Sequence, residues 1–454
     1  MNARNLRLAA VAAVTAALAL VGPAATASAA ASGATTPSTA TTTPIKHFVT
    51  LMQENHTFDN YFGSYPGADG TPAGVCMPRG GSGGCVQPWH IGTTTVEDLD
   101  HRPETLERQL DGGRMDGFVT AEAAALIDEP TLPMGYYDRR DIPYYWNVAS
   151  QYVLFDRNFT SAHAGSLSNH LYWISGRPGP ADERIPVNGF TAPTIFDRLQ
   201  RAGISWKFYV ESYDRSLTFR SRGLDDTGSQ LVRCPLLDYA RFVDDPALNR
   251  HIVPLEDYYR DLEADTLPAV SFIVPSGSSE HPPGSPAAGQ ALVSNLVSGL
   301  MRSSSWSSSA FMWSYDESGG WYDHVRPPAV DRHGYGFRAP ALLISPYARR
   351  GVVDHTQIDF TSQLKFIERN WGLRPLAARD AAATGLDSAF DFERGPRPPQ
   401  FVSPDVSTPV VEVGGQGVVY LSYGIGALLA AGIGIGAAGG IRWRRPTRSA
   451  GGKR

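Results

Sequence analysis

The sequence predicts an α/β protein with a largely parallel sheet and helices on both faces of that sheet. Two observations carry the prediction: apolar, strand-type runs alternate along the chain with helical stretches, and polar or acidic residues directly follow most of these runs. The 454 residues fit one large domain of this class with additional segments at its ends. Ligands of such sheets bind beyond the carboxyl ends of the strands. The residues that follow the strands are therefore the candidates for a functional site.

The stretch 311–325 is the clearest example of a strand that ends in acids. Phe311–Tyr315 is an apolar run, and Asp316 and Glu317 follow it directly. The turn beyond them carries a glycine pair, a third acid and a histidine: Gly319, Gly320, Asp323 and His324. Two neighbouring acids repel each other at neutral pH unless a cation, a donor network or water compensates them. The stretch predicts a ligand site, and a solvated turn is the alternative interpretation.

Three further runs are predicted strands, and two of them also lead into polar residues. Lys46–Met52 runs into Gln53-Glu54-Asn55, and Ala269–Val274 runs into Pro275 and then Glu280-His281. The fourth run ends in a serine and a proline: Pro340–Ile344. The predicted helices are Thr194–Ala202, Ala291–Met301 and Thr361–Trp371. Because the ends of parallel strands meet at one edge of a sheet, we expect the acids that follow them to lie together.

Both ends of the chain predict export and membrane attachment. Residues 1–29 have a positive start, an apolar stretch and a small-x-small cleavage pattern, as in a signal peptide. Residues 413–441 hold no charge before Arg442 and are predicted to form a transmembrane helix. The remaining segments are a Ser/Thr-rich linker (30–43), the main domain (44–394), a proline-containing stalk (395–412) and a basic tail (442–454). The predicted localisation is the cell membrane, single-pass, with the main domain extracellular and the C-terminus cytoplasmic.

The amino-acid composition indicates which classes of partner to expect and which cysteines form a disulfide. A net charge of −5 with 19% charged residues gives no strong field toward nucleic acid, so no nucleic-acid partner is expected. Cys76 and Cys85 bracket a Gly/Ser-rich loop, and in an exported chain they are expected to form a disulfide. Cys234 would then be a single buried thiol.

The residues at the strand ends have the chemistry of a metal site. Glu54, Asn55, Asp316 and Glu317 form an oxygen-rich set that suits a divalent cation of unknown identity. His101, His281 and His324 are candidates to add imidazole nitrogens or to act as acids, although an isolated histidine is more often structural. A nucleophile is still needed, and the loop 161–170 offers three serines.

The stretch Leu51-Met52-Gln53-Glu54-Asn55-His56-Thr57-Phe58-Asp59-Asn60-Tyr61-Phe62-Gly63 closely resembles the opening signature of the phosphoesterase family of bacterial phospholipases C and AcpA-type acid phosphatases. Further blocks follow in the family order up to about residue 373: Gly113–Phe118, Asn169–Trp173, Glu280–Pro282, Tyr315–Val325 and Asp354–Glu368. Each block alone is moderately specific, and together they are highly specific.

The resemblance implies an alkaline-phosphatase-like, three-layer α/β/α sandwich that hydrolyses phosphate esters at a metal site. The substrate would be either a phospholipid or a phosphomonoester. By motif position it implies that the metal ligands are Glu54, Asn55, Asp316 and Glu317. It also implies Ser166 as the nucleophile, three residues before Asn169, with His281 stabilising or protonating the phosphate or leaving group. His101 resembles a further active-site histidine, and His324 is kept as a candidate acid. Two departures are His56-Thr57 for the usual Arg-Ser, and Ser168 where many members have proline before Asn169.

Three other interpretations remain. Gly80-Gly81-Ser82-Gly83-Gly84 formally fits the serine-esterase motif, but a nucleophile elbow needs a strand before it and a helix after it. A surface-tethered module that only binds ligand on the same fold is the main alternative to an enzyme. Sulfatase or phosphoglycerate-transferase chemistry would need a different nucleophile signature. The sequence therefore predicts an exported, membrane-anchored, metal-dependent phosphate ester hydrolase, with the choice between phosphodiester and phosphomonoester left open.

Overall fold

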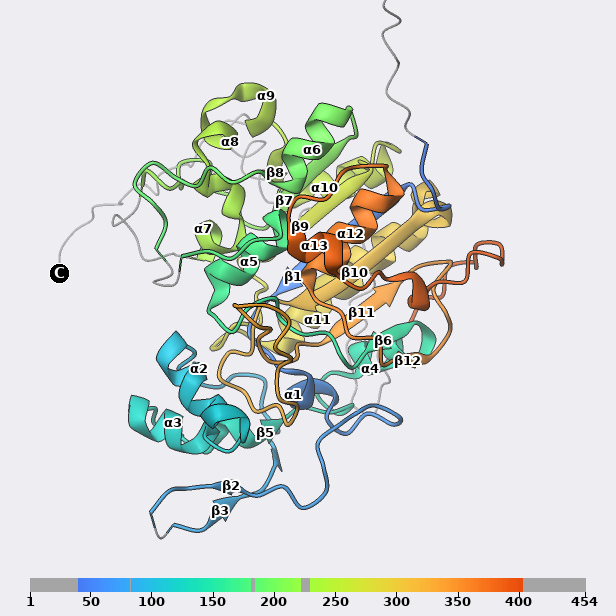
Figure 1. The fold of residues 1–454 in the computed structure, drawn as a ribbon. Coiled ribbons are helices and arrows are strands. Elements are labelled where there is room, and N and C mark those ends of the chain that lie inside the picture. The colour runs from blue at the N-terminus through green and yellow to red at the C-terminus, as the bar shows by residue number, and fades with distance from the viewer. Residues whose placement is uncertain (1–39, 82, 181–183, 222–228, 403–454) are drawn as a thin grey trace, which may run out of the picture. The chain divides into compact units, whose positions relative to one another are not determined.

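The computed structural model describes residues 40–81, 83–180, 184–221 and 229–402, and its centre is an eight-stranded sheet (Figure 1). The strand order is β12-β6-β11-β10-β1-β9-β7-β8. The strands are β1 (His47–Gln53), β6 (Val153–Phe155), β7 (Trp206–Val210), β8 (Ile252–Pro254), β9 (Val270–Val274), β10 (Ser309–Tyr315), β11 (Ala341–Ile344) and β12 (Val352–Asp354). Every pair of neighbours is parallel except the two pairs that β11 forms with β10 and β6.

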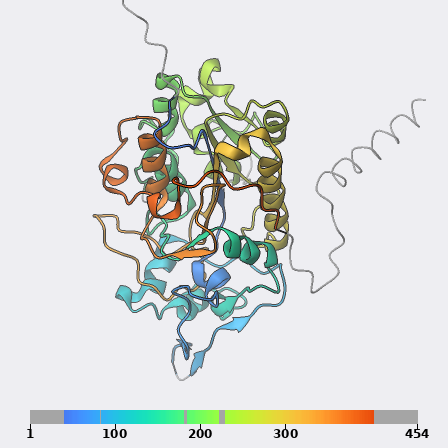
Figure 2. The same ribbon diagram turned by 90° about the vertical axis from the view of Figure 1, so that its right-hand side faces the viewer.

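Helices cover both faces of this sheet. One layer contains α5 (Ser166–Ser175), α6 (Ile195–Ala202), α12 (Phe360–Asn370) and α13 (Ala378–Ala382). The other contains α4 (Pro143–Gln151), α10 (Glu256–Glu263) and α11 (Pro286–Arg302). Figure 2 separates the layers, with α12 and α13 in orange on one side of the strands and α11 in gold on the other. The predicted three-layer α/β/α fold class with a largely parallel sheet is confirmed.

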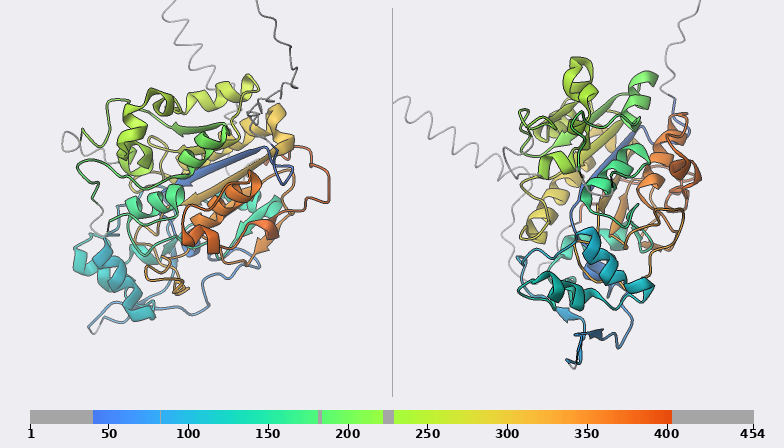
Figure 3. Two further views of the ribbon diagram at one scale, coloured as in Figure 1. Left: turned by 45° about the horizontal axis from the view of Figure 1, so that its top comes forward. Right: turned by 60° about the vertical axis from the view of Figure 1, so that its left-hand side comes forward.

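Smaller elements complete the fold. Beyond β1 lie α1 (Phe58–Phe62), α2 (Pro103–Leu110) and α3 (Phe118–Ala125), which Figure 3 shows in blue and cyan together with the short strands β2 (Met77–Pro78) and β3 (Cys85–Val86). The remaining elements are α7 (Ser229–Arg233), α8 (Ala240–Asp244), α9 (Pro246–Asn249), β4 (Trp89–His90) and β5 (Gly135–Tyr136). The predicted disulfide is present and joins Cys76, directly before β2, to Cys85 of β3, and Cys234 is a free, buried thiol as expected.

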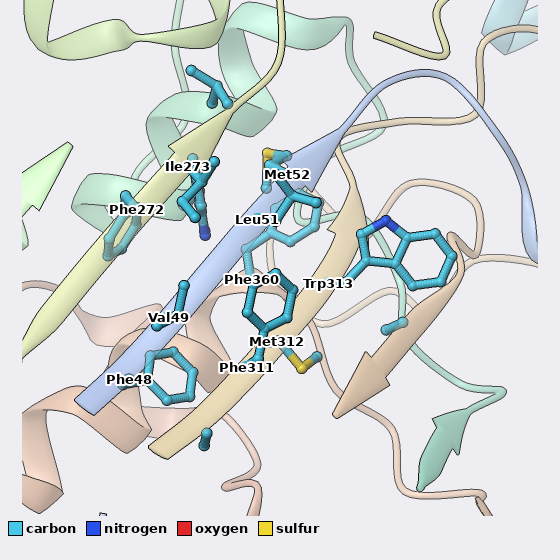
Figure 4. Close-up of a cluster of buried hydrophobic side chains, with 14 of the residues drawn as sticks. Phe48, Val49, Leu51, Met52, Phe272, Ile273, Phe311, Met312, Trp313 and Phe360 are labelled. Carbon is cyan, nitrogen blue, oxygen red and sulfur yellow. The ribbon is translucent and has the colours of Figure 1, made fainter. Parts of the chain in front are cut away.

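The core explains why the central strands have continuous apolar sequences. A parallel strand with helices on both faces buries the side chains of both faces, so its apolar residues need not alternate with polar ones. Phe48 and Val49 of β1, Phe311 and Met312 of β10, and Phe272 of β9 are all fully buried (Figure 4). These three strands pair in parallel, with Gln53 of β1 opposite Tyr315 of β10, and this register positions the residues that follow them.

Two predictions need correction. The run Pro340–Ile344 was expected to belong to the parallel set, but β11 is antiparallel, so its carboxyl end lies at the opposite edge from those of β1, β9 and β10. The predicted transmembrane helix (413–441), signal peptide and tail lie outside the described residues, as do most of the linker and part of the stalk. Within the described residues no helix is long and apolar enough to cross a membrane, and the predicted single-pass localisation is withdrawn on that finding.

Candidate active site

The register of β1 and β10 brings the two pairs of predicted metal ligands together. Gln53 lies opposite Tyr315 in the parallel ladder, so Glu54 and Asn55 leave the sheet beside Asp316 and Glu317. The backbone N–H of Asp316 donates to the carbonyl oxygen of Gln53 at 3.1 Å. The backbone N–H of Asn55 donates to Oδ1 of Asp316 at 3.2 Å. All four candidate ligands are buried.

A tight backbone contact holds Asn55 in place. Asn55 has a φ of 68°, in the left-handed region, which asparagine tolerates better than most residues. Gly319 packs directly against it: a Cβ at Gly319 would lie 2.5 Å from the Cβ of Asn55. Strained backbone that neighbouring segments hold in place is common at functional sites. The Gly-Gly turn after Glu317 therefore serves to let the two ligand-bearing segments approach each other.

Two positively charged or chargeable side chains contact Glu54. Nε of Arg233 lies 2.8 Å from Oε1 of Glu54, and Nε2 of His170 lies 3.2 Å from the same oxygen. Burial alone would raise the pKa of Glu54, but Arg233 and His170 lower it well below its ordinary value. Burial raises the pKa of Asp316 to about 8, and the negative charge of Glu54 adds to this effect. The site thus holds more acids than its own cations neutralise.

Unpartnered oxygens show that this site fits a cation. Oδ1 of Asn55 and Oδ2 of Asp316 are buried and accept no hydrogen bond from any residue that the structure describes. The ligand atoms of Glu54, His170 and Asp316 lie within 4.8 Å of one another. Buried acceptors without donors are costly unless an ion, a ligand or water compensates them. Carboxylate, amide and imidazole groups together suit a divalent metal ion.

Ser166 lies next to these acids, at the first position of α5. Its side chain is hydrogen-bonded to Asp316 and half-buried. Gly165 is the N-cap of this helix, and Asn169 fixes the loop before it by donating from Nδ2 to the carbonyl oxygens of Ala164 and Gly165. A helix N-terminus favours negative charge. Ser166 is therefore presented where an anionic phosphate ester can approach it.

His101 and His281 lie side by side at the same site. Their rings meet edge to face with centroids 5.3 Å apart, and Nδ1 of each lies 3.8 Å from Oδ1 of Asp98. Nε2 of His101 lies 3.6 Å from Glu317 and 3.4 Å from Nδ2 of Asn55. Burial would lower the pKa of His101, but Glu317 and Asp98 raise it to about 9. These two acids therefore favour the protonated form of the His101 imidazole.

His324 belongs to a different group of side chains. Its Nδ1 lies 2.7 Å from Asp59, and the buried guanidinium of Arg338 donates to Asp59 at 3.0 Å and to Asp323 at 2.9 Å. We call Asp59, Asp323, His324 and Arg338 the arginine cluster. Within the described residues no hydrogen bond or ion pair joins it to Glu54, Asp316 or Ser166. The structure thus brings together every sequence-predicted site residue except His324.

Sequence reasoning missed two residues of the site, His170 and Arg233. His170 had a usable signal, because it lies in the family block Asn169–Trp173. The stretch 161–170 was predicted to be a loop, so the helical spacing of four residues between Ser166 and His170, which places both on one helix face, was not recognised. Arg233 had none, since its ion pair with Glu54 joins residues that are 179 positions apart.

Comparisons with known proteins agree with this geometry. The model of the Phosphoesterase family matches residues 45–374. The chain is 30% identical over 438 residues to phospholipase C A of Mycobacterium tuberculosis, covering 81% of each protein. It is 29% identical over 427 residues to the non-hemolytic phospholipase C of Pseudomonas aeruginosa, covering 80% of this chain and 59% of that one.

A solved structure of an alkaline phosphatase superfamily protein from Vibrio parahaemolyticus is also similar, with 13% identity and a TM-score of 0.36, over 76% of this chain and 73% of that one. A score at this level adds nothing to the topology described above. The family match spans both ligand-bearing strand ends, the Ser166 helix and the His281 segment, which are the parts that form the site. This chain therefore belongs to the Phosphoesterase family and is a phosphoric ester hydrolase.

Proposed function

We propose that the protein is a metal-dependent phosphodiesterase of the phospholipase C type that uses Ser166 as its nucleophile. The observation that carries the proposal is the position of the Ser166 hydroxyl, which is hydrogen-bonded to Asp316 at the start of α5 and lies beside a buried, acid-rich ligand set. A nucleophile next to an oxygen-rich cation site is the arrangement that phosphoryl transfer requires.

Glu54, Asn55, Asp316 and Glu317 would hold the metal, and His170 adds a nitrogen at Glu54 and Asp316. A bound divalent cation would neutralise charge on the phosphoryl oxygens and favour the ionised form of a neighbouring hydroxyl. Arg233 neutralises Glu54 and so reduces the repulsion among the acids while the site is being formed.

Each protein group has a role in the proposed reaction. Oγ of Ser166 gives up its proton and forms a bond to phosphorus, while the bond to the leaving ester oxygen breaks and that oxygen takes up a proton. Water then breaks the bond between phosphorus and Oγ, which releases the phosphorylated head group of a diester, or phosphate from a monoester, and Oγ regains a proton. His281 and His101 offer imidazole N–H groups to the phosphoryl oxygens or to the leaving oxygen. The N-terminus of α5 favours the negative charge on the substrate.

The substrate class follows from the relatives, whose names describe phospholipases C. A phosphodiester of a lipid head group is therefore the proposed substrate, and a phosphomonoester is the competing one. The two are separated by assaying the purified protein on p-nitrophenylphosphorylcholine and p-nitrophenyl phosphate in parallel, with and without a chelator. Chelator-sensitive release from the diester supports the proposal, whereas release from the monoester alone supports an acid phosphatase.

The nucleophile is tested by Ser166→Ala. We expect kcat to fall by roughly 10³-fold or more while the protein stays folded. Ser161→Ala is the matched control, because Ser161 lies in the same loop but donates to Asp359 at 2.9 Å, and it should keep its activity. Full metal-dependent turnover by Ser166→Ala would remove the nucleophile assignment.

A module that only binds ligand remains the alternative to this mechanism. Such a module would bind metal but hydrolyse neither the diester nor the monoester. The Ser166→Ala substitution would then have no activity to reduce.

A further inference from the structure

The side chain of Glu280 is a fully buried carboxylate that the proposed reaction does not use. Tyr145 donates to its Oε1 at 2.5 Å, Tyr315 donates to its Oε2 at 2.6 Å, and Tyr61 also donates to Oε2. The three tyrosines come from α4, β10 and α1, so the carboxylate joins a strand to two helices. Within the described residues no Lys, Arg or His forms an ion pair with it. Three hydroxyl donors replace the usual cation partner of a buried acid.

The backbone of Glu280 is tied to the segment that carries Asn55. Its N–H donates to Oε1 of Gln53 at 3.1 Å, and its carbonyl oxygen lies 3.3 Å from Nε2 of His56. Gln53 and His56 flank the candidate ligands Glu54 and Asn55 in the sequence. His281 follows Glu280 directly. Main-chain contacts of one residue thus connect two parts of the active site.

The rest of this segment is also held firmly. The carboxylate of Glu211 accepts from the backbone N–H groups of Ser276, Gly277 and Ser278 at 2.9, 2.7 and 2.6 Å. On the far side, α11 approaches so closely that a Cβ at Gly289 would lie 1.9 Å from Oε1 of Glu280. The segment from residue 276 to His281 is therefore fixed at both ends and from the adjacent layer.

We propose that Glu280, held by Tyr61, Tyr145 and Tyr315, is a positioning residue that fixes His281 and the Asn55 turn in their reactive places. The inference rests on the proposed function, because it needs His281 to take part in the reaction. Burial raises the pKa of Glu280 to about 7, and hydrogen bonds from the tyrosines oppose this rise. Burying a carboxylate without a cation partner is costly. A role in placing the catalytic groups precisely explains why this cost is tolerated, because a displacement of about 1 Å can greatly reduce the rate.

The first test measures kcat and KM of Glu280→Gln and Tyr145→Phe. We expect Glu280→Gln to lower kcat roughly 100-fold with little change in KM. Tyr145→Phe removes a single hydrogen bond and should lower kcat roughly tenfold. Tyr209→Phe is the matched control, since the Tyr209 hydroxyl also donates to a buried carboxylate, Asp261, at 2.6 Å. It should lose stability and keep its kcat. An unchanged kcat in the folded fraction of both site variants would overturn the proposal.

A double-mutant cycle with His281→Asn identifies the route of the effect. If Glu280 acts through His281, Glu280→Gln should cost little more once His281 is replaced. The positioning role would be overturned if the reductions in kcat caused by the two substitutions multiply in the double variant. It would also be overturned if His281→Asn alone kept full activity. The Ser166→Ala assay reports separately on the proposed function, so the failures of the two proposals are distinguishable.

Gly289→Ala tests the same placement without changing a polar group. The added methyl group would push against the Glu280 carboxylate, so kcat should fall although alanine favours the helix. Gly299→Ala in the same helix is the control, because its Cβ would meet the side chains of Leu262 at 3.3 Å and Tyr259 at 3.6 Å and does not approach Glu280. Equal kcat values for the two alanine variants would contradict the inference.

Discussion

The candidate metal site and the arginine cluster use similar residue types in opposite ways. In the arginine cluster, the guanidinium of Arg338 lies between Asp59 and Asp323 and donates to both, and His324 also pairs with Asp59. At the candidate metal site, Glu54 is the only candidate ligand that pairs with Arg233 within the described residues, and buried oxygens of Asn55 and Asp316 have no hydrogen-bond donor there. One group is complete without a ligand and the other is not. The acids that follow β1 and β10 fit a cation because their arginine pairs with Glu54 and leaves the oxygens of Asn55 and Asp316 without a donor.

The largest expected difference is in metal binding and activity. Asp316→Asn removes a ligand charge and should lower kcat by at least roughly 10³-fold and reduce bound metal, measured by mass spectrometry after dialysis. Asp323→Asn, in the arginine cluster, should retain its metal and lose stability instead. Equal metal contents in the two variants would show that the two groups do not differ as described.

The second effect is on stability. Arg338→Met leaves two carboxylates buried without a cation, and we expect the free energy of unfolding in urea to fall by about 3–5 kcal/mol. Arg102→Ala removes an ion pair of an exposed arginine with Asp100 and should change the free energy of unfolding far less. A small loss in Arg338→Met would mean that the cluster contributes little to the folded state.

The third effect tests the close approach at the metal site. Gly319→Ala combines a φ of 58° with a clash against Asn55, so it should lose about 1–3 kcal/mol and most of its activity. Gly372 has a φ of 65° but open space around its Cβ position, so Gly372→Ala carries the backbone cost alone. If the two variants are equally active, the contact between Gly319 and Asn55 does not hold the ligand in place.

The smallest effect is a pH dependence within the arginine cluster. Burial would lower the pKa of His324, but its hydrogen bond with Asp59 raises the pKa above the ordinary value of 6.5. The folded state therefore binds the proton more tightly than the unfolded state, so this stabilisation is complete below pH 6.5 and is lost as the pH rises through the folded pKa. The melting temperature of His324→Asn should therefore depend less on pH over that range than that of the wild-type protein. If the wild-type protein instead became more stable relative to His324→Asn as the pH rises, the assigned direction of the His324 pKa shift would be wrong.

Local sequence was sufficient for the central strands and for the first ligands. The apolar runs of β1, β9 and β10 and the acids after them follow from burial on both faces, and the spacing of Cys76 and Cys85 predicted their disulfide correctly. The same reasoning placed β11 in the parallel set, because a four-residue apolar run carries no information about its direction. It also made His324 a candidate, because His324 follows Asp316 closely in the sequence and lies in the same family block, Tyr315–Val325.

The sequence by itself determined the α/β class, the central strands and the resemblance that identifies the chemistry, because each depends on residues that are neighbours along the chain. Tertiary structure decided which acids remain available for a cation. His170 reaches Glu54 across 116 positions, Arg233 across 179, and Arg338 reaches Asp59 across 279. Such pairings depend on how distant segments pack, and the packing leaves Asp316 with a free oxygen while it gives Asp323 an arginine.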